Sequence, residues 1–339
     1  MQFIKRLSLS LLIVVLCGQV TLAADKASKS IRLGIIGLDT SHVIAFTRAL
    51  NAADAKADIA NCRVVAAYPK GSPDIKSSTS RVPKYTEQMK GMGVRIVDSI
   101  DELIKQVDGI LLETNDGRPH LKQILPVLKA GLPVFVDKPI AGSLTDTIAI
   151  FEAARRNKVA VFSSSSLRYS KGAQALRAGA LGKIHGCDTY SPCHLEKTHP
   201  DLFWYGIHGV ETLFTVLGPG CKTVSRVHTK NTDFVTGHWS GGAIGTFRGI
   251  RNAAAGYGGM AYGTKGIRAV GGYDGYRPLV VEIVKFFRTG KAPIEPRETI
   301  EIYAFMEAAD ESKRRGGLPV TLAEVIAKSR KAALKKLGK

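Results

Sequence analysis

Short apolar runs alternate with longer amphipathic stretches along the first half of the chain. The short runs, rich in β-branched and aliphatic residues, predict buried strands at 32–36, 63–67, 94–97, 109–113, 133–137 and 160–162. The amphipathic stretches predict helices at 43–51, 100–106, 120–130 and 144–157. Continuous apolar strands separated by helices are typical of a doubly wound parallel sheet covered on both faces, so we expect an α/β domain at residues 31–165.

The pattern changes after residue 182, where longer runs alternate apolar and polar positions. This alternation predicts strands at 183–190, 223–229, 233–238, 243–248 and 258–262. Helices are predicted at 170–178, 201–217, 278–288 and 299–314. We therefore expect a second, α+β domain with a mainly antiparallel open sheet at residues 166–316, followed by a basic C-terminal helix at 317–339.

The N-terminal residues have the pattern of a secretory signal. Lys5 and Arg6 precede an apolar run at 7–17, and small residues suited to cleavage follow at Ala23 and Ala24. We interpret residues 1–24 as a signal peptide and expect a periplasmic or extracellular protein. Because no later stretch is apolar over the length that a bilayer requires, we expect no membrane span in the mature chain.

The formal net charge of +19 makes an anionic polymer a candidate partner. The basic residues are spread along the chain except in the last helix, where a solvated amphipathic face is the favoured explanation. No nucleic-acid-binding motif accompanies them, so a nucleic-acid partner is not predicted.

Four cysteines follow the signal peptide, namely Cys62, Cys187, Cys193 and Cys221. Export would permit disulfides, but Cys62 lies in a predicted core strand, and we expect free buried thiols. Their spacing has no zinc signature, and the sequence predicts no metal site.

The first strand leads into a glycine turn that departs from the dinucleotide-binding pattern G-x-G-x-x-G. Gly37 and Leu38 are followed by Asp39 and His42 at the places of the second and third glycines. Asp39, Thr40 and Ser41 are all residue types that cap helices, and the same helix N-terminus could bind a phosphate. Asp39 must then turn away, because two like charges ~4 Å apart repel by about 4 kcal/mol at an effective dielectric constant near 20.

Polar residues follow the fourth and fifth strands, whose carboxyl ends share one edge of a parallel sheet, where such sheets bind ligands. Glu113, Thr114 and Asn115 come after the fourth strand, and Asp137 and Lys138 after the fifth. An ammonium group at this edge can donate to a substrate hydroxyl or carbonyl, and an exposed lysine at a strand end is the alternative.

His208 is the second candidate for acid–base chemistry. Tyr205 and Glu211 lie three residues to either side, on one face of the predicted helix. The three side chains either hold and protonate a sugar hydroxyl or only stabilise the helix.

Several of these motifs together resemble the glucose–fructose oxidoreductase/inositol dehydrogenase (Gfo/Idh/MocA) family. The resemblance is carried by the strand with Gly37, segment 114–120, the Asp137-Lys138-Pro139 motif and the His208 helix. It continues through Arg168 and segments 181–184 and 289–291, and so covers nearly all of the mature chain. The resemblance implies a Rossmann-type domain that binds NAD or NADP and a hydride transfer to or from a sugar or cyclitol carbon.

The resemblance also implies roles for individual residues. The implied cofactor-binding residues are Gly37, Leu38, Asp39, Thr40, Ser41, His42, Glu113, Thr114, Asn115, Asp137 and Lys138. The implied substrate-binding residues are Arg168, Trp204, Tyr205 and His208, and the implied catalytic residues are Lys138, His208 and Tyr205. Four residues depart from the family pattern, namely Asp39, His42, Trp204 and Pro69, which lies near the place of the ribose-binding acid. These departures indicate a divergent, exported branch.

The leading hypothesis is an NAD(P)-dependent oxidoreductase acting on a sugar, cyclitol or glycoside. Because the exported compartment offers little free nucleotide, we expect such an enzyme to keep its cofactor bound. The alternatives are a redox-neutral lyase or glycosidase and a non-catalytic carbohydrate-binding protein. The second-domain sheet is a candidate interface for a homo-oligomer.

Overall fold

The computed structural model describes residues 30–338, so the predicted signal peptide at 1–24 lies outside the described residues. Within the described part, no helix has the length and apolar character needed to cross a membrane. The export of the chain therefore stays a prediction.

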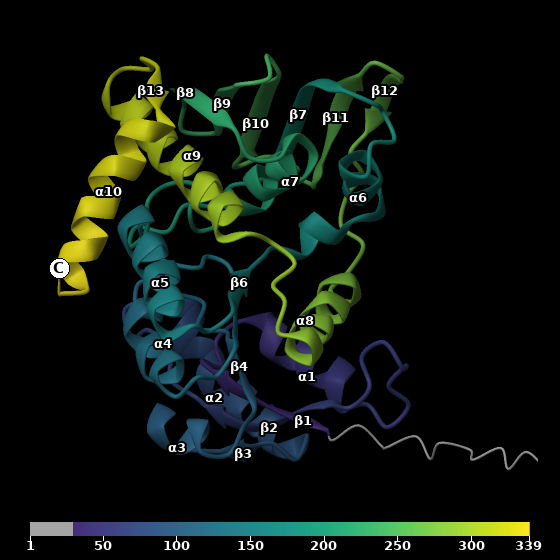
Figure 1. Cartoon of the computed structure of the whole chain (residues 1–339), viewed down its shortest axis with the longest axis vertical. Helices are drawn as coiled ribbons and strands as arrows, with labels where there is room; N and C mark the ends of the chain where they lie inside the picture. Colours follow the sequence, from purple (N-terminus) through teal and green to yellow (C-terminus); the bar gives the residue numbers. More distant parts are fainter. Residues whose placement is uncertain (1–29, 339) are drawn as a thin grey trace, which may run out of the picture.

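The first domain is built on a six-stranded parallel sheet (Figure 1). Its strands are β1 (Ile31–Ile36), β2 (Cys62–Tyr68), β3 (Arg95–Ile96), β4 (Gly109–Leu112), β5 (Val134–Val136) and β6 (Val161–Ser163). They are ordered β3-β2-β1-β4-β5-β6, which is the order of dinucleotide-binding sheets and confirms the predicted Rossmann-type fold. Because β1 pairs with both β2 and β4, the chain order reverses beside β1, and the ligand crevice of such sheets lies at that point.

The helices of the first domain are α1 (Ser41–Asn51), α2 (Lys76–Gly91), α3 (Ile100–Ile104), α4 (His120–Lys129) and α5 (Leu144–Asn157). The sequence analysis missed α2 altogether. This helix buries only Ser78 and Met89 and contains Pro83, so it lacks the apolar periodicity on which the prediction depends.

The second domain is built on a seven-stranded mixed sheet of order β12-β11-β7-β10-β9-β8-β13. Its strands are β7 (Ile184–Pro192), β8 (Cys221–His228), β9 (Thr232–Trp239), β10 (Ile244–Ile250), β11 (Gly258–Gly263), β12 (Gly266–Ala269) and β13 (Val320–Thr321). All neighbouring pairs are antiparallel except β7 and β10, which confirms the mainly antiparallel prediction. The short strands β12 and β13 were not predicted.

The remaining helices are α6 (Lys171–Arg177), α7 (Ile207–Leu217), α8 (Arg277–Thr289), α9 (Pro296–Arg314) and α10 (Leu322–Lys336), and a 3-10 turn, η1, spans Ser166–Tyr169. Helices α6, α7 and α9 lie on one side of the second sheet (Figure 1). The predicted helix at 201–217 is wrong in its first part, since residues 201–206 form turns and α7 begins at Ile207.

Two C-terminal helices join the domains. The apolar side of α8 packs into the core of the first domain, where Phe286 contacts Phe162 with ring centroids 4.9 Å apart. Helix α10 packs along α5, and Lys336 pairs with Asp146 at 2.6 Å (Figure 1). Two segments beyond residue 165 therefore pack against the first domain. Contacts between the domains cross the boundary drawn at residue 165 in the sequence.

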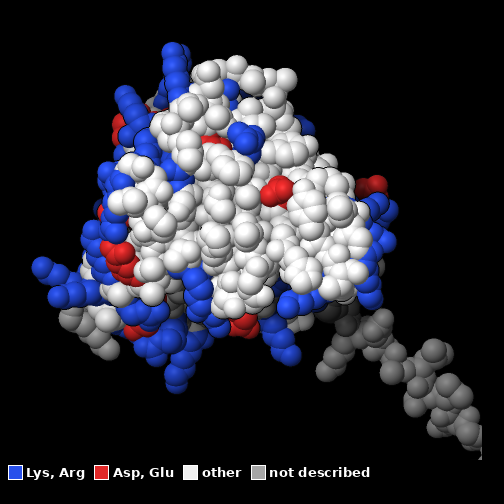
Figure 2. All heavy atoms as spheres, turned by 90° about the horizontal axis from the view of Figure 1, so that it is seen from above, with Lys and Arg blue, Asp and Glu red and all other residues white. Residues whose placement is uncertain are grey.

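The outer face of the second sheet is largely uncharged (Figure 2). It exposes Tyr190, Ile244, Met260 and Tyr262, and a hollow of about 720 Å³ lies between Tyr190, Phe234 and Met260. This is the face expected to form a homo-oligomer, and the oligomeric state stays a prediction.

The four cysteines of the described part are all buried and unpaired. This agrees with the expectation of free buried thiols.

Candidate functional site

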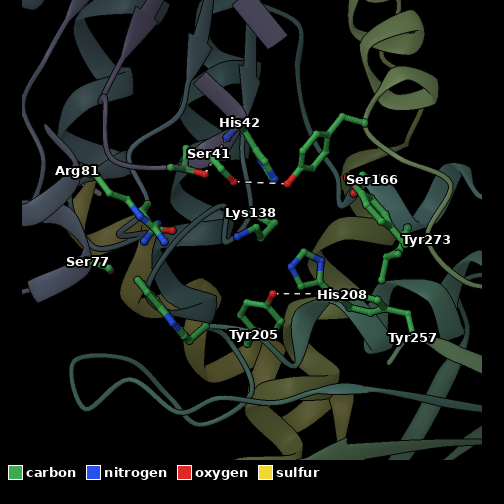
Figure 3. A pocket seen from close by; sticks show the side chains of 15 residues that line it. Ser41, His42, Ser77, Arg81, Lys138, Ser166, Tyr205, His208, Tyr257 and Tyr273 are labelled. Atoms are coloured by element: carbon green, nitrogen blue, oxygen red, sulfur yellow. Dashed lines mark hydrogen bonds between the residues drawn. The ribbon is translucent and has the colours of Figure 1, made fainter. Parts of the chain in front are cut away.

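A cavity of about 290 Å³ lies between the carboxyl edge of the first sheet and the second domain (Figure 3). Its wall from the first domain consists of Thr40, Ser41, His42, Ser77, Arg81, Asn115 and Lys138. The opposite wall consists of Ser166, Leu167, Trp204, Tyr205, His208, Tyr257, Tyr273 and Tyr276. The volume is close to the lower end of the range of small-molecule sites.

The glycine turn and the start of α1 are formed as predicted. Gly37 has a φ of 90°, and a Cβ there would lie 2.5 Å from the backbone of Thr114, so only glycine fits. The hydroxyl of Thr40 caps α1 by accepting from the amide of His42, and Ser41 Oγ lies 3.5 Å from the hydroxyl of Tyr276. Thr40 and Ser41 thus border the cavity at a helix N-terminus, which favours an anion.

The side chain of Asp39 turns away from the cavity and is fully buried. Its Oδ2 accepts from Ser78 Oγ at 2.6 Å, and its Oδ1 accepts from the amide of Asn115 at 2.8 Å. Burial raises the pKa of Asp39, and these two hydrogen bonds oppose that shift. Asp39 therefore does not point its charge at a ligand on α1, and it connects α2 to the loop after β4.

Further polar contacts hold the loop after β2 against the loop after β4. Ser72 Oγ donates to Asp116 at 2.5 Å, and Arg118 forms two hydrogen bonds with Asp74, at 2.7 and 2.9 Å. The cavity wall contains no residue from the end of β2. The structure therefore closes the region beyond β2, where Rossmann domains bind the adenosine ribose.

Lys138 follows β5 and reaches the cavity. Its amide donates to Asp137 Oδ1 at 2.8 Å, and only 8% of the residue is exposed. Figure 3 shows its ammonium group, the imidazole of His208 and the hydroxyl of Tyr205 pointing into the same space. The three residues predicted to be catalytic are therefore brought together from three segments of the chain.

A buried network orients His208. Its Nδ1 lies 2.7 Å from Ser165 Oγ, and the amide of Ser165 donates to Glu211 Oε2 at 2.7 Å. Burial, together with the positive charges of Lys138 and His42, holds the pKa of His208 well below its ordinary value. The imidazole is thus neutral near pH 7 and able to accept a proton.

Arg168 is not a cavity residue, so its predicted contact with substrate is wrong. Its guanidinium is buried and donates to Glu211 and to Glu298, each at 2.7 Å. Its two buried carboxylate partners hold the guanidinium away from the cavity. Arg168 helps to position His208 indirectly, through Glu211 and Ser165.

Some of the predicted cofactor residues also lie behind the cavity wall. Leu38, Glu113, Thr114 and Asp137 are each fully buried and do not line the cavity. Thr114 Oγ1 donates to Gln123, and Asp137 Oδ2 lies 2.7 Å from His42 Nδ1. Burial and the neighbouring charge of Asp137 raise the pKa of Glu113 well above its ordinary value.

Seven residues of the wall were not predicted, namely Ser77, Arg81, Ser166, Leu167, Tyr257, Tyr273 and Tyr276. Ser77 and Arg81 lie on the unpredicted helix α2. The tyrosines lie in or beside glycine-rich segments, 256–259 and 271–275, which have no periodic pattern. The clustering of tyrosine with glycine was the one available signal.

These tyrosines form an aromatic wall with hydroxyl groups at its surface. Tyr205 and Tyr257 share a hydrogen bond of 3.1 Å between their hydroxyls, and the rings of Tyr205 and His208 are 5.0 Å apart. Aromatic faces with polar tips suit a ligand that has both apolar faces and hydroxyl groups.

The first domain matches a family of known proteins. Residues 31–165 match the model described as an oxidoreductase family with an NAD-binding Rossmann fold. This domain belongs to the Gfo/Idh/MocA oxidoreductase family. The match confirms the resemblance inferred from the Gly37 turn and the Asp137-Lys138-Pro139 motif.

Solved structures with the Gfo/Idh/MocA architecture show that the similarity of fold extends over both domains. A probable dehydrogenase from Thermotoga maritima has a TM-score of 0.71 at 19% identity, covering 87% of this chain and 100% of that one. Scyllo-inositol dehydrogenase from Lactobacillus casei, solved with bound NAD(H) and scyllo-inositol, has a TM-score of 0.69 at 16% identity, covering 87% and 100%. At these identities, the likeness establishes the fold.

A curated relative of the Gfo/Idh/MocA domain, an uncharacterized oxidoreductase from Streptococcus pneumoniae, is 24% identical over 119 residues. The match covers 33% of this chain and 32% of the relative. This chain therefore spans about a third of the length of that relative.

The residues of the Gfo/Idh/MocA domain fit the central part of a dinucleotide. Gly37 allows the tight turn, the start of α1 offers amide and hydroxyl donors, and Arg81 adds a positive charge at the same wall. Asp39 opposes a phosphate there less than an outward-facing carboxylate would, because its side chain is turned inward and accepts from Ser78. The loops after β2 and β4 must part to admit the adenosine ribose.

Replacing Asp39 by glycine should raise the affinity for NAD(H) or NADP(H) by at least about tenfold, or about 1.4 kcal/mol. The change restores the family glycine, removes a negative charge beside the phosphate site, and frees α2 from the loop after β4. Isothermal titration with each nucleotide measures the effect. Ser78→Ala breaks the contact with α2 but keeps the charge, so it separates the two causes. An unchanged or weaker affinity of Asp39→Gly contradicts the prediction.

Proposed function

We propose that this protein is an NAD(P)-dependent oxidoreductase that acts on a secondary hydroxyl of a sugar, cyclitol or glycoside. The observation that carries the proposal is the convergence of Lys138, His208 and Tyr205 in one cavity, opposite the N-terminus of α1. When bound, the dinucleotide supplies a hydride acceptor for the carbon that loses hydrogen.

Each converging residue has a distinct task. His208 accepts the proton of the substrate hydroxyl during oxidation and returns it during reduction, since its imidazole is neutral near pH 7. Lys138 donates a hydrogen bond to the same oxygen and stabilises the negative charge that develops on it. Tyr205 fixes a further hydroxyl and is itself held by Tyr257.

The aromatic wall supports a polyhydroxylated ring as substrate. Trp204, Tyr257 and Tyr273 offer apolar faces, while the hydroxyls of the tyrosines offer donors and acceptors. The small cavity suits one or two rings better than a polymer. The scyllo-inositol found in the Lactobacillus casei structure is a ligand of this chemical class.

A retained cofactor is part of the proposal. The predicted export places the enzyme where nucleotide cannot be replenished readily, so a cofactor that stays bound between turnovers is required.

Nucleotide content is the test of this function. The purified mature protein is denatured, released NAD(H) or NADP(H) is measured by chromatography, and the refolded or apo protein is titrated with both. Released nucleotide, or binding of either one, supports the oxidoreductase. Absence of nucleotide and of binding at millimolar concentration rules it out, and sugar binding under those conditions supports the carbohydrate-binding alternative.

Export has its own test. Intact-mass measurement of the protein recovered outside the cytoplasm should show a chain that begins after Ala23 or Ala24. A full-length chain that stays in the cytoplasm would contradict both export and the argument for a retained cofactor.

A further inference from the structure

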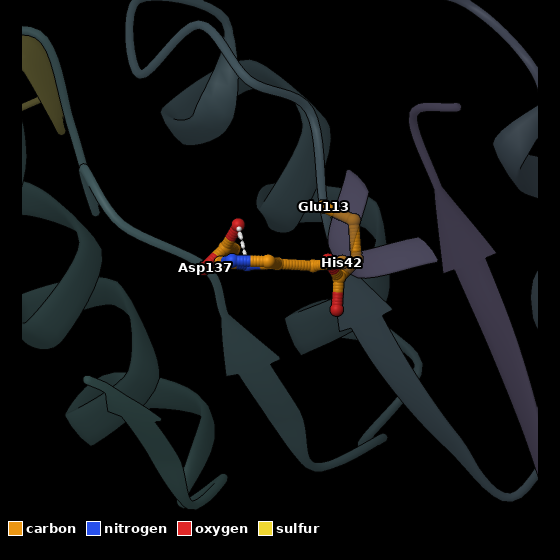
Figure 4. Close-up of side chains that lie close together, drawn as sticks. All are labelled: His42, Glu113 and Asp137. Carbon is orange, nitrogen blue, oxygen red and sulfur yellow. Dashed lines mark hydrogen bonds and ion pairs between the residues drawn. The ribbon is translucent and has the colours of Figure 1, made fainter. Parts of the chain in front are cut away.

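Three side chains of metal-ligating types lie close together beside the cavity, with His42 in its wall and Glu113 and Asp137 behind it (Figure 4). Glu113 comes from the end of β4, Asp137 from the end of β5 and His42 from the first turn of α1. One ligand atom of each lies within 4.8 Å of the others, and all three residues are buried. They meet because the carboxyl ends of β1, β4 and β5 are neighbours in the sheet.

Glu113 is the unusual member of this cluster. It is fully buried, and neither of its carboxylate oxygens has a hydrogen-bond partner among the described residues. It is the one carboxylate in that condition among residues 30–338. Buried polar groups are normally satisfied, so a carboxylate without partners beside a histidine and a second carboxylate indicates a missing positive ligand.

The other two side chains are already oriented as ligands. Asp137 Oδ1 accepts from the amide of Lys138, which leaves Oδ2 directed at His42 Nδ1, 2.7 Å away. The His42 ring is held by stacking on Phe46 at 5.2 Å and by the edge of Tyr276 at 4.7 Å. Hydrogen bonds and packing that fix ligands from behind are typical of metal sites.

The geometry leaves room for an ion after a small movement. Two ligands at 2.0–2.2 Å in a tetrahedral site lie roughly 3.3 Å apart. Replacing the proton between His42 and Asp137 by an ion thus requires these two ligand atoms to separate by roughly 0.6 Å, while the Glu113 carboxylate, within 4.8 Å of them, moves inward. Such a shift is within the range of side-chain adjustment.

We propose that His42 Nδ1, Asp137 Oδ2 and the carboxylate of Glu113 bind a divalent transition-metal ion, with Zn²⁺ preferred. One imidazole with two carboxylates suits Zn²⁺, Fe²⁺ or Mn²⁺ better than Mg²⁺ or Ca²⁺, which favour oxygen ligands alone. Three protein ligands leave a further position open, as in catalytic zinc sites.

The inference also explains the departure at the third glycine position of the turn. A glycine at residue 42 could offer no ligand, whereas histidine there reaches both carboxylates. The proposal goes beyond the oxidoreductase function, because Glu113 and Asp137 lie behind the cavity wall and take no part in the proposed reaction.

Metal uptake by the full mature chain tests the proposal. The protein is treated with EDTA, dialysed, and titrated separately with ZnCl₂, MnCl₂ and MgCl₂, with bound metal measured by mass spectrometry. We expect about one equivalent of Zn²⁺ per chain, weaker Mn²⁺ and no stoichiometric Mg²⁺. Less than ~0.1 equivalent of Zn²⁺, or binding of Mg²⁺ in preference to Zn²⁺, would overturn the proposal.

Variants assign the ligands. Glu113→Gln and His42→Phe should each weaken Zn²⁺ binding beyond the ~10–100-fold that loss of an outer-shell partner costs. His42→Phe keeps an aromatic ring against Phe46 and serves if Glu113→Gln folds poorly. His228→Ala is the matched control, because His228 also lies 2.6 Å from an aspartate, Asp233, on the second sheet. Wild-type affinity in both site variants, or equal loss in the control, would refute the assignment.

Thermal unfolding gives a second readout. Zn²⁺ should raise the melting temperature of the wild type and of His228→Ala, and leave that of the site variants unchanged. These measurements need neither nucleotide nor substrate. The proposed metal site can therefore be refuted without refuting the oxidoreductase function, and the oxidoreductase function can be refuted without refuting the metal site.

Discussion

Replacing Lys138 by methionine should lower kcat by about 10²–10³-fold, the range expected when a hydrogen-bond donor to the oxygen that gains negative charge is lost. Lys138 is the one lysine among the described residues that lines the cavity, and methionine keeps most of the length of its side chain. The ammonium group acts on the oxygen that gains charge in the transition state, so kcat should fall far more than KM rises.

The measurement is steady-state turnover with the substrate and nucleotide found in the binding experiments. Lys70→Met is the matched control, because Lys70 follows β2, is exposed, and does not line the cavity. Its turnover should match that of the wild type. A Lys138→Met enzyme that keeps turnover within about threefold of the wild type would remove Lys138 from the reaction, since a donor to the developing charge contributes much more. Nucleotide titration of both variants separates a loss of chemistry from a loss of binding.

The sheet of the first domain could be predicted because its strands are buried on both faces. Leu33, Ile35 and Ile36 on β1 and all of β4 are apolar or glycine, so each strand is a continuous run whatever its neighbours are. Helix α2 has no such pattern, because most of its residues face solvent. It nevertheless contributes Ser77 and Arg81 to the cavity wall, so the site predicted from the sequence lacked both residues.

The direction of a side chain was harder to predict than its place in the chain. Asp39 stands in the phosphate loop, and its contacts with Ser78 and Asn115 depend on a helix and a loop distant in sequence. Arg168 was placed near substrate, whereas Glu298, 130 residues later, helps draw it into the interior. Local sequence cannot show such long-range partners, and these partners decide the direction of both charged groups.

Replacing Arg168 by methionine should destabilise the fold by about 3–5 kcal/mol, because it leaves two buried carboxylates without their shared cation. Arg168 is 2% exposed and contacts Glu211 and Glu298, which are 3% and 4% exposed. Glu298 keeps its pair with Arg177 at 2.8 Å, so most of the cost arises at Glu211. Denaturant unfolding measures the change in the free energy of unfolding.

The matched control is an exposed pair of the same kind. Arg277 pairs with Asp58 at 2.8 Å, and both side chains are nearly half exposed, so Arg277→Met should cost much less stability than Arg168→Met. Equal effects of the two substitutions would show that burial does not decide the strength of the Arg168 pairs.

Replacing Arg168 by methionine should also affect the active site. Glu211 accepts from Arg168, from Ser164 and from the amide of Ser165, whose hydroxyl lies 2.7 Å from His208 Nδ1. Without Arg168 the Glu211 carboxylate shifts or takes up a proton, and the orientation of His208 is loosened. Folded Arg168→Met enzyme should therefore show a reduced kcat with little change in nucleotide affinity, because the α1 N-terminus is untouched. A normal kcat in the destabilised variant would limit Arg168 to a structural role and separate the stability of this network from the positioning of His208.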